Sequence, residues 1–332
     1  MDRCPIIHIT TQRGVGALVD YPARYSREVW SRVRVLTIDA AASESEWPRG
    51  IYLITNTDCM SRPQLDKAQW LYEKLKSDPS AFAVLNNPSR VLGRYALLRK
   101  LHELGINDFN VHRVRDLPAP VRFPAFVRDE NLHRANLSPI VHTQAELDDA
   151  IAELLTAENH KDDYLVSEYI DYRDGDRLFR KYGAQKVGPH VFGKHLMAGQ
   201  HWMLKRRSSR RRAVGKDELP YVRDFPHRQE LEQAFEVAGH DWARVDYSFY
   251  RGRVQVWEIN CNPAMGTKWK RDIGRGRANR ATYLHFDRAL ADVAKDIQPG
   301  PPLQFQVPVR DVPAQLQGEG SEPLVAGRTT EV

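Results

Sequence analysis

Apolar positions in the first third of the chain form short runs that alternate with longer amphipathic stretches. Short apolar runs bounded by turn residues are typical of buried strands, whereas apolar residues at helical spacing indicate a helix that buries one face. Two such stripes predict helices at 63–76 and 90–104, the second ended by Gly105. Strands are expected at 5–10, 33–38, 51–55 and 82–85. This alternation predicts an α/β domain.

Two further units follow in the pattern. In the first, strands at 123–128 and 164–170 flank a helix that Thr143 caps, with Glu146 completing the capping box. The second contains strands, helices and a hairpin, expected at 179–187, 191–197, 227–238, 243–259 and 280–297. Beyond them Pro, Gly, Gln and Glu dominate, which is typical of disorder. We therefore expect an N-terminal domain (1–112), a central subdomain (113–171), a C-terminal subdomain (172–298) and a largely disordered tail (299–332).

The hairpin at 243–259 and the residues that follow it hold the most informative polar positions. A three-residue loop around Gly252 would set Tyr250 opposite Val254, and the facing residues of an antiparallel pair then keep a constant sum. The other face would hold apolar residues of the core. A two-residue loop would instead place Asp246 and Glu258 on different faces. On one face we expect Asp246 opposite Glu258 and Arg244 opposite Asn260, and on the other Val245, Tyr247, Phe249, Trp257 and Ile259.

Two carboxylates and a carboxamide at a strand end are hard oxygen ligands, which suit Mg²⁺. Facing carboxylates repel each other unless a cation or a proton lies between them. A polar pair on a solvated hairpin is the alternative interpretation for Asp246 and Glu258. The following Asn260, Asn262 and Pro263 favour the metal site.

The segment Arg-Val-Asp-Tyr, with Glu-Ile-Asn-Cys-Asn-Pro twelve residues on from its aspartate, resembles the metal-binding end of the ATP-grasp superfamily. The resemblance covers about residues 83–298. It implies an α/β (α+β) fold of three subdomains, with ATP between two antiparallel-sheet lobes. It also implies that Asp246, Glu258 and Asn260 hold one or two Mg²⁺ ions, with Mn²⁺ as an alternative, against the ATP phosphates.

Two cations and a hinge segment match the same family. Arg94, after Asn87-Pro88, and Arg128 stand where most members carry phosphate-binding lysines, and arginine keeps the charge but adds a planar fork. Glu168, Tyr169 and Ile170 resemble the hinge that reads adenine through its backbone, with Asp171 or Asp174 for the ribose. Each position has a plainer alternative: a solvated helix residue for Arg94, an ion pair with Glu130 for Arg128, and an edge-strand charge for Glu168.

Contacts to the transferred phosphoryl group are expected from strands 179–187 and 191–197. Because side chains alternate, Arg180 and Lys181 cannot both face the site. We prefer either of them to His195, which fits a packed or surface histidine. Lys205 is a third candidate, because it follows Trp202 where many family members carry a mobile loop.

Charge is concentrated in one segment. The chain has 332 residues with 49 basic and 43 acidic ones, and six of the basic residues lie in the run 205–212. Without that run the chain is neutral, which excludes a uniformly nucleic-acid-coating protein. The run is either a solvated loop or an electropositive lid for ATP or an anionic partner, such as a phosphorylated substrate or a tRNA.

Cysteine usage and hydrophobicity indicate the compartment. The three cysteines lack metal-like spacing and fit a reducing environment, and no apolar run is long enough to span a bilayer. We therefore expect a cytoplasmic protein without a membrane partner, and the oligomeric state is left open. Cys261, inside the metal motif, is expected to be a small packed residue.

Together these features predict an ATP- and Mg²⁺-dependent ligase. It would activate a substrate carboxylate as an acyl phosphate for attack by an amine, such as an amino acid, a peptide or an aminoacyl-type substrate. Two alternatives stay open: a small-molecule kinase on the same scaffold, and a non-catalytic nucleotide- or RNA-binding module.

Overall fold

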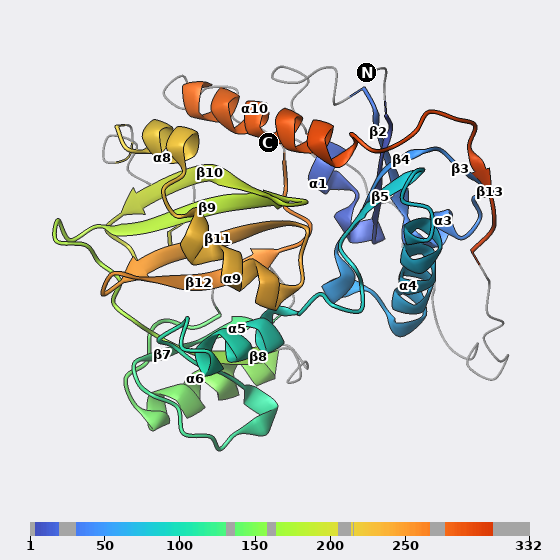
Figure 1. Cartoon of the computed structure of the whole chain (residues 1–332). Coiled ribbons are helices and arrows are strands. Elements are labelled where there is room, and N and C mark those ends of the chain that lie inside the picture. Colours follow the sequence, from blue (N-terminus) through green and yellow to red (C-terminus); the bar gives the residue numbers. More distant parts are fainter. Residues whose placement is uncertain are drawn as a thin grey trace, which may run out of the picture.

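The computed structural model of the chain describes residues 4–19, 31–130, 137–157, 164–204, 214, 216–265 and 276–307. Within them lie three principal sheets, one parallel and two antiparallel (Figure 1). The parallel sheet lies to one side of the antiparallel ones. This arrangement confirms the mixed α/β class that the sequence predicts.

The parallel sheet is built from the first apolar runs, in the order β2-β1-β4-β5. Each strand coincides with a predicted run, because continuous apolar stretches suit a sheet buried on both faces. Helix α4 (Arg62–Lys76) covers it, starts with a capping box between Ser61 and Gln64, and buries Leu71 and Leu75 in the core. The strands are β1 (Ile6–Thr10), β2 (Val33–Thr37), β4 (Gly50–Ile54) and β5 (Phe82–Leu85), and the short helices α1 (Gly16–Val19) and α3 (Ile38–Ala41) lie beside them.

The larger antiparallel sheet has the order β10-β9-β11-β12. One face packs on α8 (Glu218–Asp224), α9 and α5. Helix α9 ends at Gly239, which adopts the left-handed conformation that ends many helices. The strands are β9 (Phe179–Val187), β10 (His190–Gly199), β11 (Trp242–Tyr250) and β12 (Arg253–Asn260), and the two longer helices are α5 (Arg94–Glu103) and α9 (Arg228–Ala238).

Helix α5 packs on this sheet, although its place in the chain led us to count it with the N-terminal unit. Its apolar stripe of Leu97, Leu98 and Leu101 joins the core formed by α9 and the β11–β12 hairpin. The helix begins at Arg94, four residues later than predicted, with Gly93 at the N-cap. The helix therefore brings Arg94 to the antiparallel sheet.

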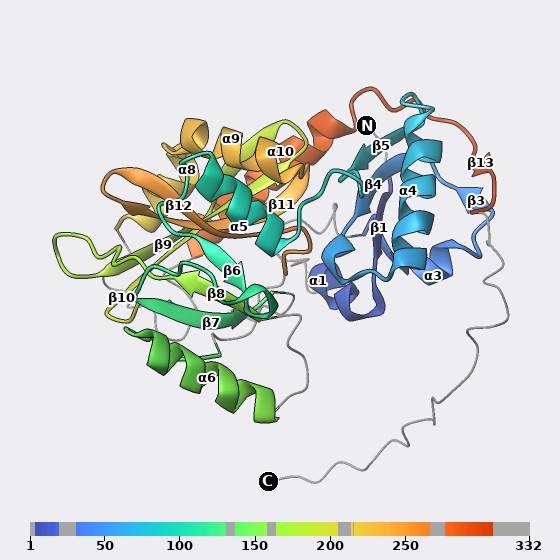
Figure 2. The same ribbon diagram turned by 90° about the horizontal axis from the view of Figure 1, so that it is seen from below.

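The third sheet is three-stranded, with the order β6-β8-β7. Helix α6 (Gln144–Ala157) covers its outer face (Figure 2). The strands are β6 (Val111–Arg113), β7 (Ala125–Asp129) and β8 (Tyr164–Glu168). Strand β8 is central, so the alternative of an edge-strand charge at Glu168 is wrong.

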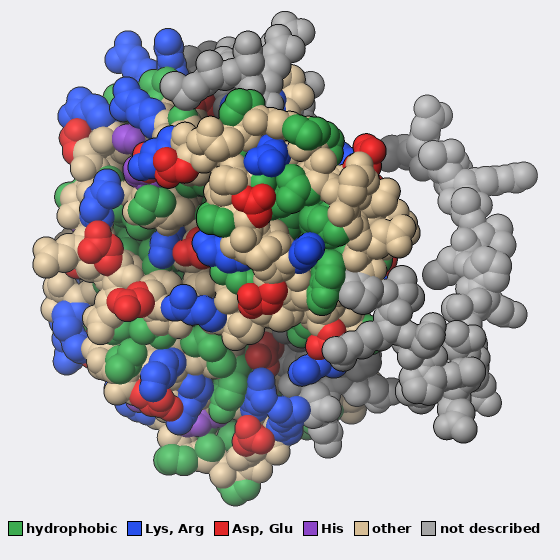
Figure 3. Space-filling model, turned by 45° about the vertical axis from the view of Figure 1, so that its right-hand side comes forward, with side chains coloured by type: hydrophobic (Ala, Val, Ile, Leu, Met, Phe, Trp, Pro, Cys, Tyr) green, Lys and Arg blue, Asp and Glu red, His purple; other side chains and the backbone are tan. Residues whose placement is uncertain are grey.

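Helix α10 (Gly276–Val293) joins the parallel sheet to the larger antiparallel sheet. Tyr283 and Phe286 are fully buried in a cluster that also holds Ile6 and Leu53 of the parallel sheet and Trp242 of β11. Among the helices that the structure describes, none has the length and hydrophobicity that a membrane span requires. On the face shown in Figure 3, basic and acidic side chains are interspersed.

The start of the predicted tail, residues 299–307, packs on the N-terminal unit. Strand β13 (Leu303–Gln304) pairs with β3 (Glu46–Trp47), and Phe305 stacks on Trp47 with ring centroids 5.1 Å apart. The Trp47 indole also donates a hydrogen bond to the Phe305 carbonyl, at 2.9 Å. The composition of this segment is typical of disorder, but strand pairing, the aromatic contacts of Phe305 and the burial of Val307 hold it. Residues 308–332 lie outside the described ranges.

We predict that Phe305→Ala lowers the free energy of unfolding by about 2 kcal/mol, because it removes a half-buried ring from Trp47. Urea unfolding of the full chain measures this. Gln304→Ala, which changes the exposed residue before Phe305, should change stability by less than about 0.5 kcal/mol. Equal effects of the two substitutions would contradict the prediction.

Candidate active site

The β11–β12 hairpin turns through two residues instead of the three that we expected. Tyr250 pairs with Arg253, and both Arg251 (φ 51°) and Gly252 (φ 77°) have positive φ. Two consecutive residues in this conformation form the tight turn whose twist matches that of the flanking strands. By itself this shorter loop would separate Asp246 from Glu258.

A β-bulge at Trp257 restores the expected pairing. Tyr247 pairs with Val256 but Asp246 pairs with Glu258, so Trp257 is an extra residue in β12. From the bulge to the strand end the register is the predicted one, including Arg244 opposite Asn260. The pairing of Asp246 with Glu258 is therefore the predicted one. The three-residue loop from which we predicted it is wrong, because a two-residue turn and a bulge produce the same register.

The bulge also moves Trp257 out of the core face on which we placed it. Its indole donates a hydrogen bond to the Ser248 hydroxyl at 2.8 Å, and Ser248 lies two residues after Asp246 on the same face. The ring stacks on Phe109 at 4.9 Å between centroids. In the helix-facing core Val256 takes the place opposite Tyr247.

Asp246 is buried and contacts two cations, Lys181 from the neighbouring strand β9 and Arg244 from its own strand β11. Its carboxylate accepts from Lys181 Nζ at 2.9 Å and from Arg244 Nε at 3.0 Å, and His195 Nε2 lies 3.9 Å away. Gly183 makes room for the His195 ring, because a Cβ there would lie 2.6 Å from Nε2. The histidine is thus packed, as expected, but it is packed within the site.

Glu258, across the hairpin from Asp246, contacts the two predicted phosphate-binding cations. Arg94 donates to it at 2.7 Å, and the Arg128 guanidinium lies 3.6 Å away. Both alternatives for these arginines are wrong, because the Arg94 side chain is 5% exposed and the carboxylate paired with Arg128 is Glu258. Arg94 also donates to the carbonyls of Asp129 and Glu130, at 2.7 and 2.8 Å.

The cations of this cluster outnumber its carboxylates by four to two. Burial and the nearby Arg94 lower the pKa of Arg128 to about 9, so it stays charged at neutral pH. Burial acts to raise the pKa of Asp246, but Arg244 and Lys181 outweigh it and bring that pKa to about 2. A desolvated cluster with surplus positive charge attracts a polyanion.

Three further predicted residues, Arg180, Asp171 and Lys205, are not among the described residues of the cluster. Arg180 points away from Lys181 and pairs with Asp174 and Asp176, each at 2.6 Å, so it does not join the cluster. Asp171 pairs with Arg173, with Nε 2.8 Å from Oδ1. Lys205 and the rest of the basic run 205–212 lie outside the described residues.

Glu168 connects the strands of the three-stranded sheet. Its carboxylate accepts from the backbone N–H groups of Asn110 and Arg122, both at 3.1 Å. The N–H groups of Glu168 and Tyr169 donate to the Asn110 and Pro124 carbonyls, at 3.0 and 2.8 Å. Ile170 is buried in the main core. The N–H groups of Glu168 and Tyr169 are thus used within the protein.

Sequence reasoning gave no functional role to two residues of this region. It placed Arg244 opposite Asn260, on the face of Asp246, but did not count it among the cations of the site. Trp202 packs on Phe126 and Tyr169, with ring centroids 4.8 and 5.6 Å away, and therefore lies beside the hinge. In the sequence, only the position of Trp202 just before the basic run 205–212 could have pointed to it.

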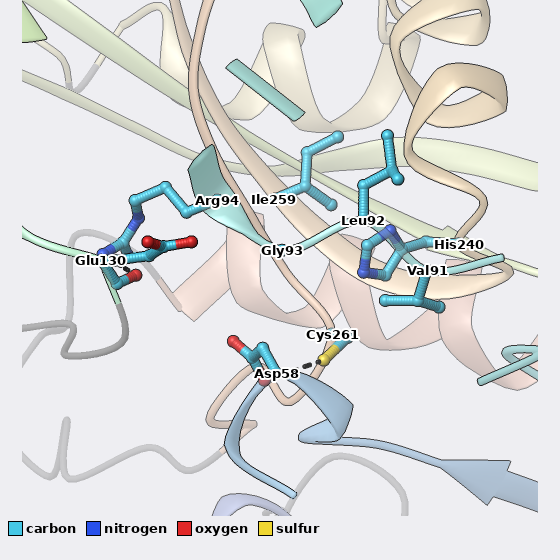
Figure 4. Close-up of a pocket in the computed structure, with 9 residues that line it drawn as sticks. All are labelled: Asp58, Val91, Leu92, Gly93, Arg94, Glu130, His240, Ile259 and Cys261. Atoms are coloured by element: carbon cyan, nitrogen blue, oxygen red, sulfur yellow. Dashed lines mark hydrogen bonds between the residues drawn. The ribbon is translucent and has the colours of Figure 1, made fainter. Parts of the chain in front are cut away.

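A small recess lies next to Arg94, where the parallel sheet meets the end of β12 (Figure 4). Asp58, in the loop after β4, and Cys261, after β12, approach each other across its floor. Burial raises the pKa of Cys261 to about 12, so its thiol is protonated, in agreement with the packed residue that we expected. The other lining residues are Val91, Leu92, Gly93, Arg94, Glu130, His240 and Ile259.

The hairpin supplies oxygen donors of the kind that Mg²⁺ takes. Asp246 is kept ionised, Glu258 faces it in register, and the Asn260 side-chain oxygen is held by the Asn262 N–H at 2.8 Å. Nowhere in the described residues do three His, Cys, Asp or Glu side chains converge to hold a metal. A cation here would therefore rest on oxygen ligands from the hairpin and from a bound phosphate.

No family model and no curated protein matches the sequence. Several solved structures are similar to it. The chain aligns with D-alanine–D-alanine ligase from Bacillus anthracis complexed with ATP at 13% identity, covering 88% of this chain and 99% of that one, with a TM-score of 0.46. The D-alanine–D-alanine ligase from Coxiella burnetii aligns at 14% identity, covering 88% of this chain and 97% of that one, with a TM-score of 0.48. The ligase from Helicobacter pylori aligns at 12% identity, covering 90% of this chain and 100% of that one, with a TM-score of 0.46.

We predict that the stabilising effect of Asp246 is lost in acid. Its pKa lies below the ordinary 3.8, so its contribution is complete above about pH 4 and disappears as the pH falls to about 2. The stability difference between the wild type and Asp246→Asn should therefore shrink by about 2 kcal/mol over that range. Urea unfolding at a series of pH values measures it.

Asp66→Asn, which changes an exposed carboxylate on α4, is the control. Its difference from the wild type gives the effect of removing a carboxylate that lies outside the cluster. A difference between Asp246→Asn and the wild type that does not change with pH would show that Lys181 and Arg244 do not hold this carboxylate ionised.

Proposed function

We propose that the protein is an ATP- and Mg²⁺-dependent ligase that joins a carboxylate to an amine. The observation that carries the proposal is the cluster of Arg94, Arg128, Lys181 and Arg244 around two facing carboxylates. A nucleoside triphosphate with one Mg²⁺ keeps a net negative charge, and the surplus positive charge of the cluster would balance it.

The three predicted cations approach the hairpin from three different elements. Arg94 and Arg128 approach Glu258 from α5 and β7, and Lys181 approaches Asp246 from β9. Because Arg94 and Arg128 repel each other at close range, a phosphate between them would be stabilised by both. Asp246, Glu258 and Asn260 would hold Mg²⁺, which when bound neutralises charge on the phosphate oxygens.

The chemistry divides into two displacements. An oxygen of the substrate carboxylate attacks the γ-phosphorus, the bond to the β–γ bridging oxygen breaks, and ADP leaves with that electron pair. Lys181 and Arg128 would stabilise the charge that develops on the phosphoryl oxygens. The amine nitrogen then attacks the acyl carbon, phosphate leaves, and the nitrogen loses a proton. Positioning and exclusion of water carry this reaction, so no side-chain nucleophile is required.

The amine is proposed to belong to an amino acid, a peptide or an aminoacyl-type substrate. ADP release that requires both an acid and an amine supports the ligase. ADP release without an amine, with a stable phosphorylated product, would assign the protein to the kinases instead. Tight ATP binding without turnover would assign it to the binding modules.

Neighbouring residues on opposite faces of β9 provide the sharpest test. Lys181→Met should lower kcat about 100-fold or more, because it removes a charge at the phosphoryl group. Arg180→Met, which removes an equal charge from the other face, should stay within about threefold of the wild type. ADP formation across a panel of acids and amines measures both. Equal losses in the two variants would contradict the assigned site.

A further inference from the structure

The loop that follows β12 sets the orientation of Asn260. The Asn262 backbone N–H donates to the Asn260 side-chain oxygen at 2.8 Å, so the direction of this carboxamide depends on where Asn262 lies. Asn260 itself stands at the strand end, opposite Arg244. Whatever holds Asn262 therefore also holds the proposed metal ligand.

The carboxyl edge of the parallel sheet holds Asn262. Its side-chain amide donates to the Gly14 carbonyl at 3.1 Å, and its side-chain oxygen accepts from the Thr55 hydroxyl at 3.3 Å. Gly14 permits this approach, because a Cβ there would lie 2.6 Å from the amide nitrogen of Asn262. The contacts join residues more than 200 positions apart in the chain.

His8 fixes the direction of the Thr55 hydroxyl. Its Nε2 lies 2.7 Å from the Thr55 oxygen, and burial lowers the pKa of His8 to about 4, so the ring is neutral. Because the Thr55 hydroxyl donates its proton to the Asn262 side-chain oxygen, it can only accept from His8. The His8 ring must then carry its proton on Nε2, so the hydrogen-bond network assigns the tautomer. The three side chains then form one directed chain of hydrogen bonds from β1 to the loop after β12.

A second contact holds the same loop from the side. The Asn56 backbone N–H donates to the Cys261 sulfur at 3.2 Å, and Cys261 is buried against the segment that follows β4. Figure 4 shows this thiol beside Asp58 at the same junction. The loop is thus fixed at two successive residues, one by its side-chain amide and one by its sulfur.

We propose that Thr55 and Asn262, directed by His8, are positioning residues for Asn260, so that the parallel sheet sets the geometry of the metal site. This inference rests on the proposed function. It gives the parallel sheet a task in metal binding through the loop that carries Asn262. Residues that orient a metal ligand in this way change metal affinity by about 10- to 100-fold when they are removed.

The test compares two buried threonines of the same edge. Thr55→Val removes the hydroxyl that holds Asn262, whereas Thr10→Val removes a hydroxyl for which the described residues provide no hydrogen-bond partner. We expect Thr55→Val to weaken Mn²⁺ binding about 10-fold or more in the presence of a non-hydrolysable ATP analogue. Thr10→Val should keep the wild-type affinity, and Thr55→Ser should restore it.

A second readout separates positioning from loss of structure. Binding of the analogue without metal depends on Arg94, Arg128 and Lys181, so it should be unchanged in Thr55→Val. Asn262→Asp, which replaces the donor to the Gly14 carbonyl by an oxygen, should weaken Mn²⁺ binding at least as much as Thr55→Val. Electron paramagnetic resonance of free Mn²⁺ measures the affinity on the full chain.

Three results would overturn the inference. Equal loss of Mn²⁺ affinity in Thr55→Val and Thr10→Val would show a general effect of the buried edge, and wild-type affinity in Thr55→Val would show that the anchor does not act on Asn260. If the wild type binds no Mn²⁺ with the analogue, the metal site of the proposed function fails first, and the inference fails with it.

Discussion

The structure of the site depends on one electrostatic constraint: Asp246 and Glu258 face each other on a largely buried hairpin. Two carboxylates in this position repel, and burial makes the repulsion more costly. The protein compensates with cations from outside the hairpin, of which Lys181 and Arg94 make the shortest contacts. Each cation must come from an element that packs close to the hairpin, so the charge pairing restricts the architecture.

That restriction accounts for the packing of α5. Because Arg94 is the first residue of the helix, its guanidinium reaches Glu258 only if the helix lies beside β12. Arg128 does the same for the three-stranded sheet, since it lies on β7 and its guanidinium approaches the same carboxylate. Three segments far apart in the chain thus meet at one pair of acids. The surplus of positive charge that results is what a phosphate ligand would neutralise.

Much of this could be predicted from the sequence, because hydrophobic periodicity and strand alternation are local. They predicted the parallel strands, α4, and the separation of Arg180 from Lys181. The pairing of Asp246 with Glu258 was predicted as well, but for an incomplete reason. A shorter turn and a bulge at Trp257 shift the register by compensating amounts, and no local pattern distinguishes that combination from a longer loop.

Other features depended on contacts that no local pattern encodes. The role of Glu168 comes from backbone N–H groups of two distant segments, and β13 is held by a stacking partner more than 250 residues away. The hold of Thr55 on Asn262 has the same origin. Both residues stand at strand ends in the sequence, but their contact appears only when the parallel sheet meets the hairpin.

The arginines that replace the lysines expected from the ATP-grasp resemblance follow from the same geometry. Arg94 donates through one terminal nitrogen to Glu258 and through the other to the carbonyls of Asp129 and Glu130. A guanidinium can serve both sides because its donors are fixed in a planar fork, whereas a lysine ammonium is a single point of charge. In this protein Arg94, which stands at the predicted phosphate-binding position, joins α5, β7 and β12. Arginine therefore suits the packing of the three elements, and under the proposed function its charge would also serve the ligand.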